Sequence, residues 1–329
     1  MNLARVDQIA KAVLYEGYML YPYRPSSVKN RQRWNFGVLY PQTYCDWKGG
    51  TDACSVQTEC LVCGTVRAVL EVKLRFLQLQ LRWTRGANAD DEDASSNGWQ
   101  EAVERDVSVP AFTLETTTFG PVKQSFAFPP QIMVDTNPNR EGEVVRRQLE
   151  VRGELATTAQ QIRQGLFKVR VDVRNSTPME TSEVSREDVL LQSLVSTHTI
   201  LGVEGGEFIS PLEPPDLQDP AAQCQNVGAW PVLVGDPGQR DTLLASPIIL
   251  YDYPQIAPES AGDLFDGTEI DEILSLRIMT LTDEEKREIR QSDERARQIL
   301  ERIDSMPAEQ FMKLHGAVRG LRPLKESAP

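Results

Sequence analysis

The longest alternation of apolar and polar residues runs from Val69 to Trp83 and predicts a β-strand. Its apolar side chains change face in the middle, between Phe76 and Leu77. They form two sets, Leu70, Val72, Leu74 and Phe76 on one face and Leu77, Leu79, Leu81 and Trp83 on the other. Such a phase change is typical of a β-bulge, or of a strand that passes between two packed sheets.

A second clear alternation places apolar residues at every other position from Phe167 to Val173, with charged residues between them. It ends at Asn175-Ser176-Thr177-Pro178, so we predict a half-buried antiparallel strand that stops there. Further extended segments, mostly separated by turn-forming residues, are predicted at Ala102 to Leu114, Gln124 to Phe128, Gln148 to Leu155, Leu191 to Val203 and Trp230 to Gly235.

The two ends of the chain follow a helical period instead. Apolar residues from Leu3 to Leu14 recur at helical spacing and predict an amphipathic N-terminal helix. Thr268 precedes apolar residues at the same spacing, and the capping box Thr282-Asp283-Glu284-Glu285 predicts a helix that runs to about Ile303. The polar segments Arg85 to Gly98 and Pro211 to Ala222 are predicted as exposed loops.

Many strands with few helices between them favour a mainly β fold over a parallel α/β sheet. We expect an antiparallel β-sandwich-like core with an N-terminal helix and aromatic arm and a C-terminal helical extension. The predicted division is residues 1–50 for the helix and the aromatic, basic arm, 51–257 for the β-rich core, and 258–329 for the helical extension.

Composition restricts the kinds of partner that we expect this protein to bind. The chain has 329 residues, of which 40% are hydrophobic, so it can bury a core without disulfides or a metal. Its net charge of −13 opposes binding to a polyanion, and we expect no nucleic-acid partner. Residues 1–50 nevertheless hold seven Lys and Arg against three Asp and Glu, so the acidic excess lies in the remainder of the chain.

The cysteines and the absence of long apolar runs bear on location. No run of about 18 apolar residues occurs, and the N-terminus lacks the apolar stretch of a secretory signal. The five cysteines are an odd number, which fits a reducing compartment. We therefore predict a cytoplasmic protein with no membrane insertion.

A group of four cysteines is the sharpest chemical candidate. It consists of Cys45, Cys54, Cys60 and Cys63 and ends in a Cys-x-x-Cys pair. Four thiolates could bind zinc tetrahedrally, although structural zinc sites usually show two close pairs, and eight residues separate the first two cysteines here. The alternative is that these are small, buried thiols. We predict no cofactor, with zinc as the alternative.

Catalytic motifs are absent from the sequence. The imidazole bases are His198 and His315, and His198 lies in a predicted strand, where a hydrogen-bonded structural histidine is the common outcome. No phosphate-binding glycine loop, nucleophile elbow or HExxH motif occurs. We predict that the protein is not an enzyme. The rival hypothesis is a metal-binding (zinc or nickel) or enzymatic protein that uses Cys60, Cys63 and His198.

An aromatic and basic segment, residues 15–47, is the best candidate for a binding surface, because Tyr, Trp and Arg dominate the energetics of protein interfaces. The residues predicted to bind a protein partner are Tyr21, Tyr23, Arg24, Arg31, Arg33 and Trp34. Packing of the same side chains within the core, or as a lid over it, is the alternative.

Several runs of the sequence carry a resemblance to a known family. They are Tyr15-Glu16-Gly17-Tyr18-Met19-Leu20-Tyr21-Pro22-Tyr23-Arg24, Lys29-Asn30-Arg31-Gln32-Arg33-Trp34, Thr58-Glu59-Cys60-Leu61, Ser196-Thr197-His198-Thr199-Ile200-Leu201, Ser246-Pro247-Ile248-Ile249-Leu250-Tyr251-Asp252 and Ala257-Pro258-Glu259-Ser260. They resemble a family of uncharacterised conserved proteins associated with nickel-iron hydrogenase gene clusters. The resemblance implies an accessory role in hydrogenase assembly or maturation, with a hydrogenase subunit or maturation factor as the protein partner.

Overall fold

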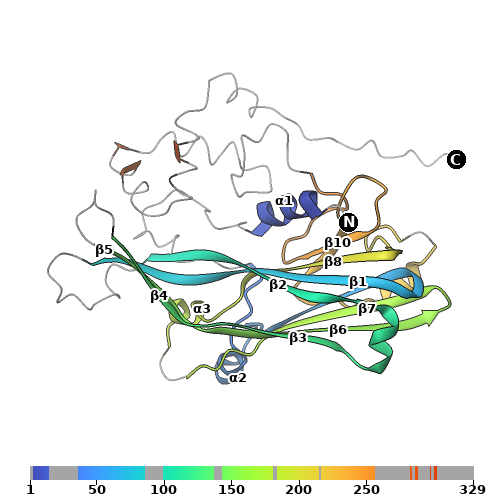
Figure 1. The fold of residues 1–329 in the computed structure, drawn as a ribbon, viewed down its shortest axis with the longest axis horizontal. Helices are drawn as coiled ribbons and strands as arrows, with labels where there is room; N and C mark the ends of the chain where they lie inside the picture. Colours follow the sequence, from blue (N-terminus) through green and yellow to red (C-terminus); the bar gives the residue numbers. More distant parts are fainter. Residues whose placement is uncertain are drawn as a thin grey trace, which may run out of the picture.

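A computed structural model describes residues 3–14, 36–85, 99–136, 143–180, 184–214 and 216–255, together with seven positions between Thr282 and Glu301. The fold is mainly β, as the sequence predicts (Figure 1). The helices are α1 (Leu3–Leu14), α2 (Gln42–Lys48), the 3₁₀ helix η2 (Leu114–Phe119), α3 (Arg186–Leu190) and α4 (Gln218–Ala222). The strands are β1 (Ser55–Arg85), β2 (Trp99–Thr113), β3 (Val122–Phe128), β4 (Gln131–Thr136), β5 (Glu143–Gln148), β6 (Val151–Arg163), β7 (Leu166–Asn175), β8 (Val195–Phe208), β9 (Trp230–Leu233) and β10 (Thr242–Ser246).

Strand β1 organises the sheet. It is 31 residues long and pairs in turn with β7, β8, β2 and β5, always antiparallel. The main path of the ten-stranded sheet is β3-β6-β7-β1-β8-β10-β9, with β2 beside β1 and with β4 beside β5. The described strands thus form one continuous hydrogen-bonded sheet, and a sandwich-like arrangement of separate sheets is not confirmed.

The predicted change of face within β1 coincides with a break in strand pairing. Arg75 pairs with His198 but Leu77 pairs with Val195, so the register between β1 and β8 shifts by one residue at this point. The extra residue belongs to β8, where Ser196 has a positive φ of 52°. A bulge is therefore present at this position, but on β8, where it does not turn the side chains of β1. The change of face in β1 instead reflects burial on both sides of the strand, because Phe76 packs in one core cluster and Leu77 packs in another on the opposite face.

The main core lies between one face of β1 and strands β3 and β6 of the same sheet. Phe76 of β1 packs against Phe126 and Phe128 of β3, with ring centroids 5.8 Å away in each case. Because β3 is the far end of the main sheet path, these contacts require the sheet to curl over itself. Gly153 of β6 permits this packing, since a Cβ there would lie 2.2 Å from the Phe126 ring.

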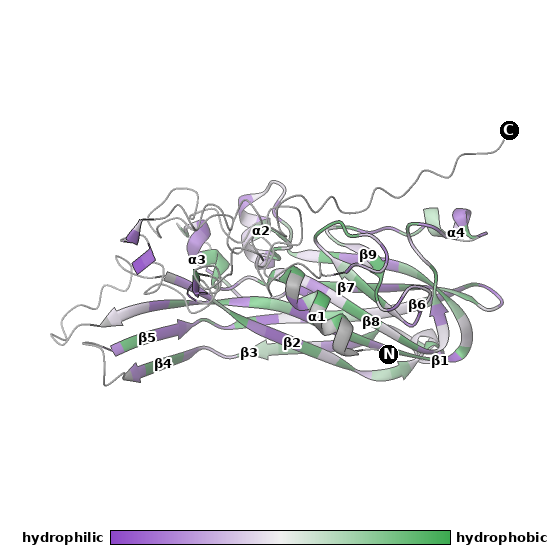
Figure 2. Cartoon of the chain, turned by 90° about the horizontal axis from the view of Figure 1, so that it is seen from above, coloured by the Kyte–Doolittle hydropathy of each residue, from purple (hydrophilic) through white to green (hydrophobic). Residues whose placement is uncertain are grey.

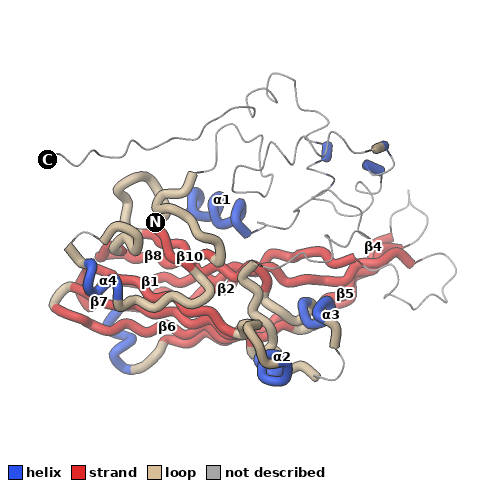
Figure 3. Tube along the Cα trace, turned by 180° about the vertical axis from the view of Figure 1, so that it is seen from behind, coloured by secondary structure: helices blue, strands red, loops and turns tan. Residues whose placement is uncertain are grey.

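The opposite face of the sheet carries helices α1, α2 and α3, whereas Leu114 of η2 belongs to the main core. Apolar residues of α1 pack with apolar residues of β8, β10 and the β9 region, and the packed set is Val6, Ile9, Ala10, Val13, Ile200, Val232, Val234 and Leu244. Leu77 and Leu79 pack with Tyr40, Tyr44 and the α3 region. Figure 3 shows α2 and α3 near each other at the side of the sheet. The N-terminal helix predicted from its spacing is confirmed.

Several predicted boundaries differ from the structure. The single segment Gln148 to Leu155 is divided between β5 and β6, because the chain leaves the ladder at Leu149 and Glu150. Strand β10 was not predicted because all five of its residues are buried and no alternation marks it. The predicted loop Pro211 to Ala222 contains α4.

The predicted C-terminal helices fall largely outside the described residues. Asp283, Lys286 and Arg287 are helical, and the Lys286 backbone N–H donates to the Thr282 carbonyl at 2.9 Å. That bond fits the predicted helix start. The loop Arg85 to Gly98 lies outside the described residues except for Arg85, which ends β1. The domain division at residues 50 and 257 stays a prediction. None of the helices in the described part of the chain has the length and apolar character needed to cross a membrane.

Candidate functional site

The described end of the predicted aromatic segment forms a ladder of three aromatic rings at α2. Tyr40 precedes the helix, and Tyr44 and Trp47 lie on it, one helical turn apart. The ring centroids are 5.5 Å apart for Tyr40 and Tyr44 and 6.2 Å apart for Tyr44 and Trp47. Both pairs are tilted, by 39° and 42°, at separations typical of aromatic contacts. We call Tyr40, Tyr44 and Trp47 the aromatic ladder.

Burial falls sharply along the aromatic ladder. Tyr40 and Tyr44 are 5% and 3% exposed, whereas Trp47 is 54% exposed. Burial raises the pKa of the Tyr40 hydroxyl, even though interactions with Arg186 act in the opposite direction. Tyr40 and Tyr44 are therefore fixed in the core, whereas Trp47 packs against Tyr44 and exposes apolar surface to solvent.

Local sequence explains why α2 is short and firmly placed. Pro41 stands before the helix with φ −52° and its carbonyl accepts from the backbone N–H of Tyr44 at 3.0 Å. The helix ends where Gly49 takes φ 66°, and the Gly49 N–H donates to the Cys45 carbonyl at 3.0 Å. A proline start and a glycine end thus hold Trp47 at a fixed position.

A charged pair lies beside the aromatic ladder, at Tyr44. The Lys48 ammonium lies 5.2 Å from the centre of the Tyr44 ring and 2.8 Å from an Asp52 carboxylate oxygen. The hydrogen bond to Asp52, assisted by Tyr44, raises the pKa of Lys48. An apolar aromatic surface bordered by a paired charge is the usual composition of a protein-binding hot spot and its rim.

The six residues predicted to bind a partner lie outside the described residues. They are Tyr21, Tyr23, Arg24, Arg31, Arg33 and Trp34. The described part of the same segment adds two exposed aromatic residues, Phe36 and Trp47. The sequence could single out neither, because aromatic composition alone does not separate an exposed ring from buried ones such as Tyr40 and Tyr44.

The four candidate metal-binding cysteines are not brought together. Cys60 and Cys63 lie on β1, where an interval of three residues turns side chains to opposite faces of the sheet. Cys60 is accordingly in the main core, while Cys63 packs beside Leu61 and Leu166. Cys45 of α2 has Cys54 as a neighbour, and burial together with that thiol raises the pKa of Cys45 to about 11.

Buried thiols with raised pKa values are poor nucleophiles and poor metal ligands at neutral pH. Burial raises the pKa of Cys60, which is 2% exposed, and of Cys63. Within the part of the chain that the structure describes, no group of three or more His, Cys, Asp and Glu side chains could hold a metal ion.

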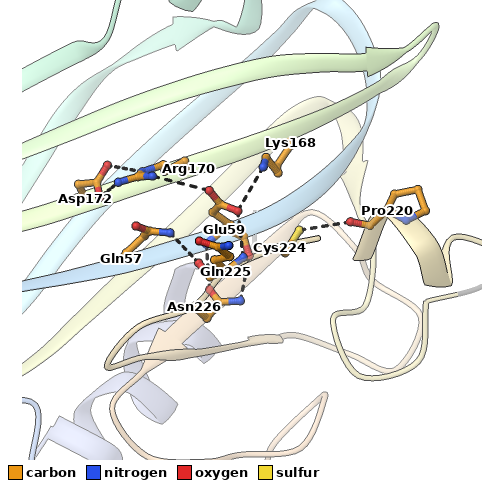
Figure 4. A network of polar contacts seen from close by, with 9 residues as sticks. All are labelled: Gln57, Glu59, Lys168, Arg170, Asp172, Pro220, Cys224, Gln225 and Asn226. Carbon is orange, nitrogen blue, oxygen red and sulfur yellow. Dashed lines mark hydrogen bonds and ion pairs between the residues drawn. The ribbon is translucent and has the colours of Figure 1, made fainter. Parts of the chain in front are cut away.

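Figure 4 shows a polar network centred on Glu59, the residue that precedes Cys60 in β1. Its side chain is 6% exposed, and one carboxylate oxygen accepts from the Gln225 backbone N–H at 2.9 Å. The Lys168 ammonium is 3.4 Å away and an Arg170 nitrogen 3.9 Å away. A buried carboxylate with a cation and a backbone donor is well compensated.

Asn226 completes this network by imitating a neighbouring strand. Its side-chain oxygen accepts from the Glu59 backbone N–H at 2.9 Å, and its side-chain nitrogen donates to the Glu59 carbonyl at 3.2 Å. Val227 pairs with Gln57 through both backbone bonds. Residues 225–227 thus cover an edge of β1 that would otherwise be open, which gives the charges at Glu59 a structural role.

His198 is fully buried and bonded at both ring nitrogens. Nδ1 lies 2.7 Å from the Ser196 carbonyl oxygen, so Nδ1 carries the proton, and Nε2 accepts from the Ser246 hydroxyl at 3.2 Å. Burial, together with the nearby Arg75 guanidinium, lowers the pKa of His198 to about 4, against a raising effect of the Ser196 bond. Ser246 is also fully buried and accepts from the Ile248 N–H at 3.1 Å.

His198 and Cys60 do not share a site. His198 pairs with Arg75, and Arg75 alternates with the inward-facing Leu74 and Phe76. His198 and Arg75 therefore lie on the opposite face of the sheet from Cys60, which belongs to the same core as Leu74 and Phe76.

Comparison with known proteins adds no family: no protein-family model and no curated protein matches this chain.

Proposed function

We propose that this chain is a non-catalytic, cytoplasmic accessory protein that binds another protein, with Trp47 as one anchor of the binding surface. The observation that supports this proposal most directly is the aromatic ladder: Trp47 is 54% exposed although the two rings beneath it are buried. An exposed Trp that already packs against a buried ring loses little side-chain freedom on binding, so it can contribute affinity at low entropic cost.

The assignment of the partner to nickel-iron hydrogenase assembly or maturation is supported by the resemblance of the sequence runs alone. The cytoplasmic location is supported by the odd number of cysteines. The non-catalytic part of the proposal is supported by the engagement of His198 and Cys60, which are buried and on opposite faces of the sheet.

Affinity capture from hydrogenase-expressing cells, read by mass spectrometry, tests the proposal with Trp47→Ala. We expect the wild-type chain to retain a hydrogenase subunit or maturation factor and the variant to retain it roughly thirtyfold less, the effect of a hot spot of about 2 kcal/mol. The melting temperature should stay within a few degrees, because half of the ring is already in water. Phe119→Ala is the matched control, since Phe119 is 90% exposed on a different element, η2.

Arg31→Glu with Arg33→Glu extends the test to the part of the segment predicted from sequence. If these arginines meet the partner, capture falls and the melting temperature holds, because exposed charges add little stability. If they pair with acidic residues of this same chain, capture and melting temperature fall together. Wild-type capture by both this double variant and Trp47→Ala would remove the segment as the binding surface.

A further inference from the structure

Strand β4 forms an open edge at the end of a projecting four-stranded arm. Within the described residues β4 pairs only with β5, which in turn pairs with the last six residues of β1. Figures 1 and 3 place β4 and β5 at the end of the molecule farthest from the β6–β7 turn. Two apolar side chains of β4 face solvent, with Ile132 67% and Val134 47% exposed.

The arm is held rigid by a ladder of charges that crosses its strands. Asp135 of β4 pairs with Arg146 of β5, whose Nε donates to Glu101 of β2 at 2.9 Å. Arg82 of β1 meets the same Glu101 at 3.2 Å. Since Glu101 and Arg82 are each 15% exposed, these pairs are shielded from water and fix the strands more firmly than surface pairs would.

Two other strand edges in the described part of the chain carry protecting features. β9 is covered where Tyr253 donates to the Leu233 carbonyl at 2.7 Å and Asp252 accepts from the Leu233 N–H at 2.8 Å. β2 carries Pro110, which lacks an N–H, beside a register shift. Figure 2 shows that strand β4 carries hydrophobic as well as hydrophilic residues. A six-residue edge with exposed apolar side chains is a template for another strand.

We propose that β4 pairs antiparallel with β4 of a second copy of this chain, in the register that places Met133 opposite Met133. When a two-fold axis perpendicular to the sheet relates two antiparallel strands, residues that lie opposite each other point to the same face of the sheet. A residue before Met133 therefore lies opposite the residue that is equally far after Met133 in the other copy. In this register Ile132 faces Val134 twice, and Gln131 faces Asp135 twice.

The side chains of β4 are self-complementary in that register. The exposed apolar pair is buried against itself, and each Asp135 carboxylate meets an amide that can donate to it instead of a second carboxylate. A shift of the centre to Val134 would set Ile132 against Thr136 and Met133 against Asp135, which loses both matches. The resulting sheet would run continuously through both arms.

Charge sets the strength of the dimer and how it responds to salt. Each chain carries a net charge of −13, so two copies repel, and added salt screens that repulsion. A six-residue strand pair is a small interface, and we expect a dissociation constant of roughly micromolar order. Salt should strengthen the association, whereas binding of a basic peptide to the same edge would weaken with salt. This surface is separate from the aromatic ladder, so the inference stands independently of the proposed function.

Sedimentation of the full chain over a concentration series is the first test. We expect a monomer–dimer equilibrium that tightens with salt and is lost in Ile132→Lys with Val134→Lys, because that double variant sets lysines against lysines. Ile162→Lys with Tyr251→Lys adds the same charge at exposed apolar positions elsewhere in the chain and should leave the dimer intact. The melting temperatures of both double variants show whether they are folded.

Cysteine cross-linking tests the register. With oxidised glutathione as the electron acceptor, two thiols introduced by Met133→Cys should form a disulfide between copies, with each pair losing two electrons and two protons. Gln131→Cys alone should cross-link no more than the wild type with its native cysteines, but should cross-link when mixed with Asp135→Cys.

Three results would overturn the proposal. They are a monomer at every concentration, a dimer unaffected by the lysines on β4, and equal cross-linking by Gln131→Cys and Met133→Cys. A chain that stays monomeric but binds a basic peptide at β4 would assign the edge to a different protein.

Discussion

The protonation of His198 links the bulge in β8 to the stability of the whole fold. The imidazole is fully buried, accepts a hydrogen bond from Ser246, and has a pKa of about 4, against the usual 6.5. Charging it would reverse the Ser246 hydrogen bond, with Nε2 as the donor, and would place a buried cation beside the Arg75 guanidinium. The folded chain therefore resists protonation at a pH where the unfolded chain accepts it.

The sign and size of the effect follow from this difference. Because the pKa is lower in the folded chain, the contribution is complete above about pH 6.5 and is lost as the pH falls toward 4. The full loss is about 3 kcal/mol, and about 2.5 kcal/mol of it falls between about pH 7.5 and pH 4.5. That is a large part of the stability of an ordinary domain.

Urea unfolding at a series of pH values measures this loss. His198→Gln should be less stable than the wild type near pH 7.5 but should lack most of the wild-type decline toward pH 4.5. The control is His315→Gln, which removes the other histidine and should keep the wild-type decline.

Asp106 does not obscure the result. Burial alone would raise its pKa, but hydrogen bonds from Arg75 and Lys73 outweigh burial and lower it. Its contribution is therefore lost below its usual 3.8, outside the window in which His198 titrates. An unchanged free energy of unfolding over that window, or a wild-type decline in His198→Gln, would refute the reasoning.

Three further predictions test the structural reading of other polar residues. Asn175→Ala should cost about 2–4 kcal/mol in urea unfolding, because its buried amide donates to the carbonyls of Leu39 and Gln192 at 2.8 and 3.0 Å; a cost below about 1 kcal/mol would contradict this. Asn226→Ala should cost about 1–3 kcal/mol and speed hydrogen exchange at the Glu59 amide, and unchanged exchange would count against the edge-covering role. Metal analysis of protein purified under reducing conditions should find far less than one zinc or nickel per chain, and stoichiometric metal that is lost on Cys60→Ser would reverse the ranking of the two functions.

The cysteines show what a local spacing leaves open. The alternation that marks β1 is clear only from Val69, so the sequence does not show that Cys60 and Cys63 lie on the same strand. Their Cys-x-x-Cys spacing is therefore also compatible with one edge of a zinc site. The strand begins at Ser55, where side chains of both faces are largely buried and alternation fades. Once the pair is on a strand, its period of two alone separates the thiols.

Local chemistry determined what depends on near neighbours in the sequence. The period of two defined β1 and β7, and the helical period defined α1, because burial of one face imposes these patterns on consecutive residues. The change of face at Phe76 and Leu77 marks the place where both faces of β1 are buried.

Only the tertiary structure decided contacts between distant residues. Asn226 meets Glu59 across 167 residues of chain, and Ser246 meets His198 across 48. The same holds for exposure: Trp47 and Tyr44 belong to one aromatic segment, but the packing of α2 against the sheet buries one and leaves the other in solvent. Sequence patterns record which side chains must be buried together, whereas the curling of the sheet determines which residues meet.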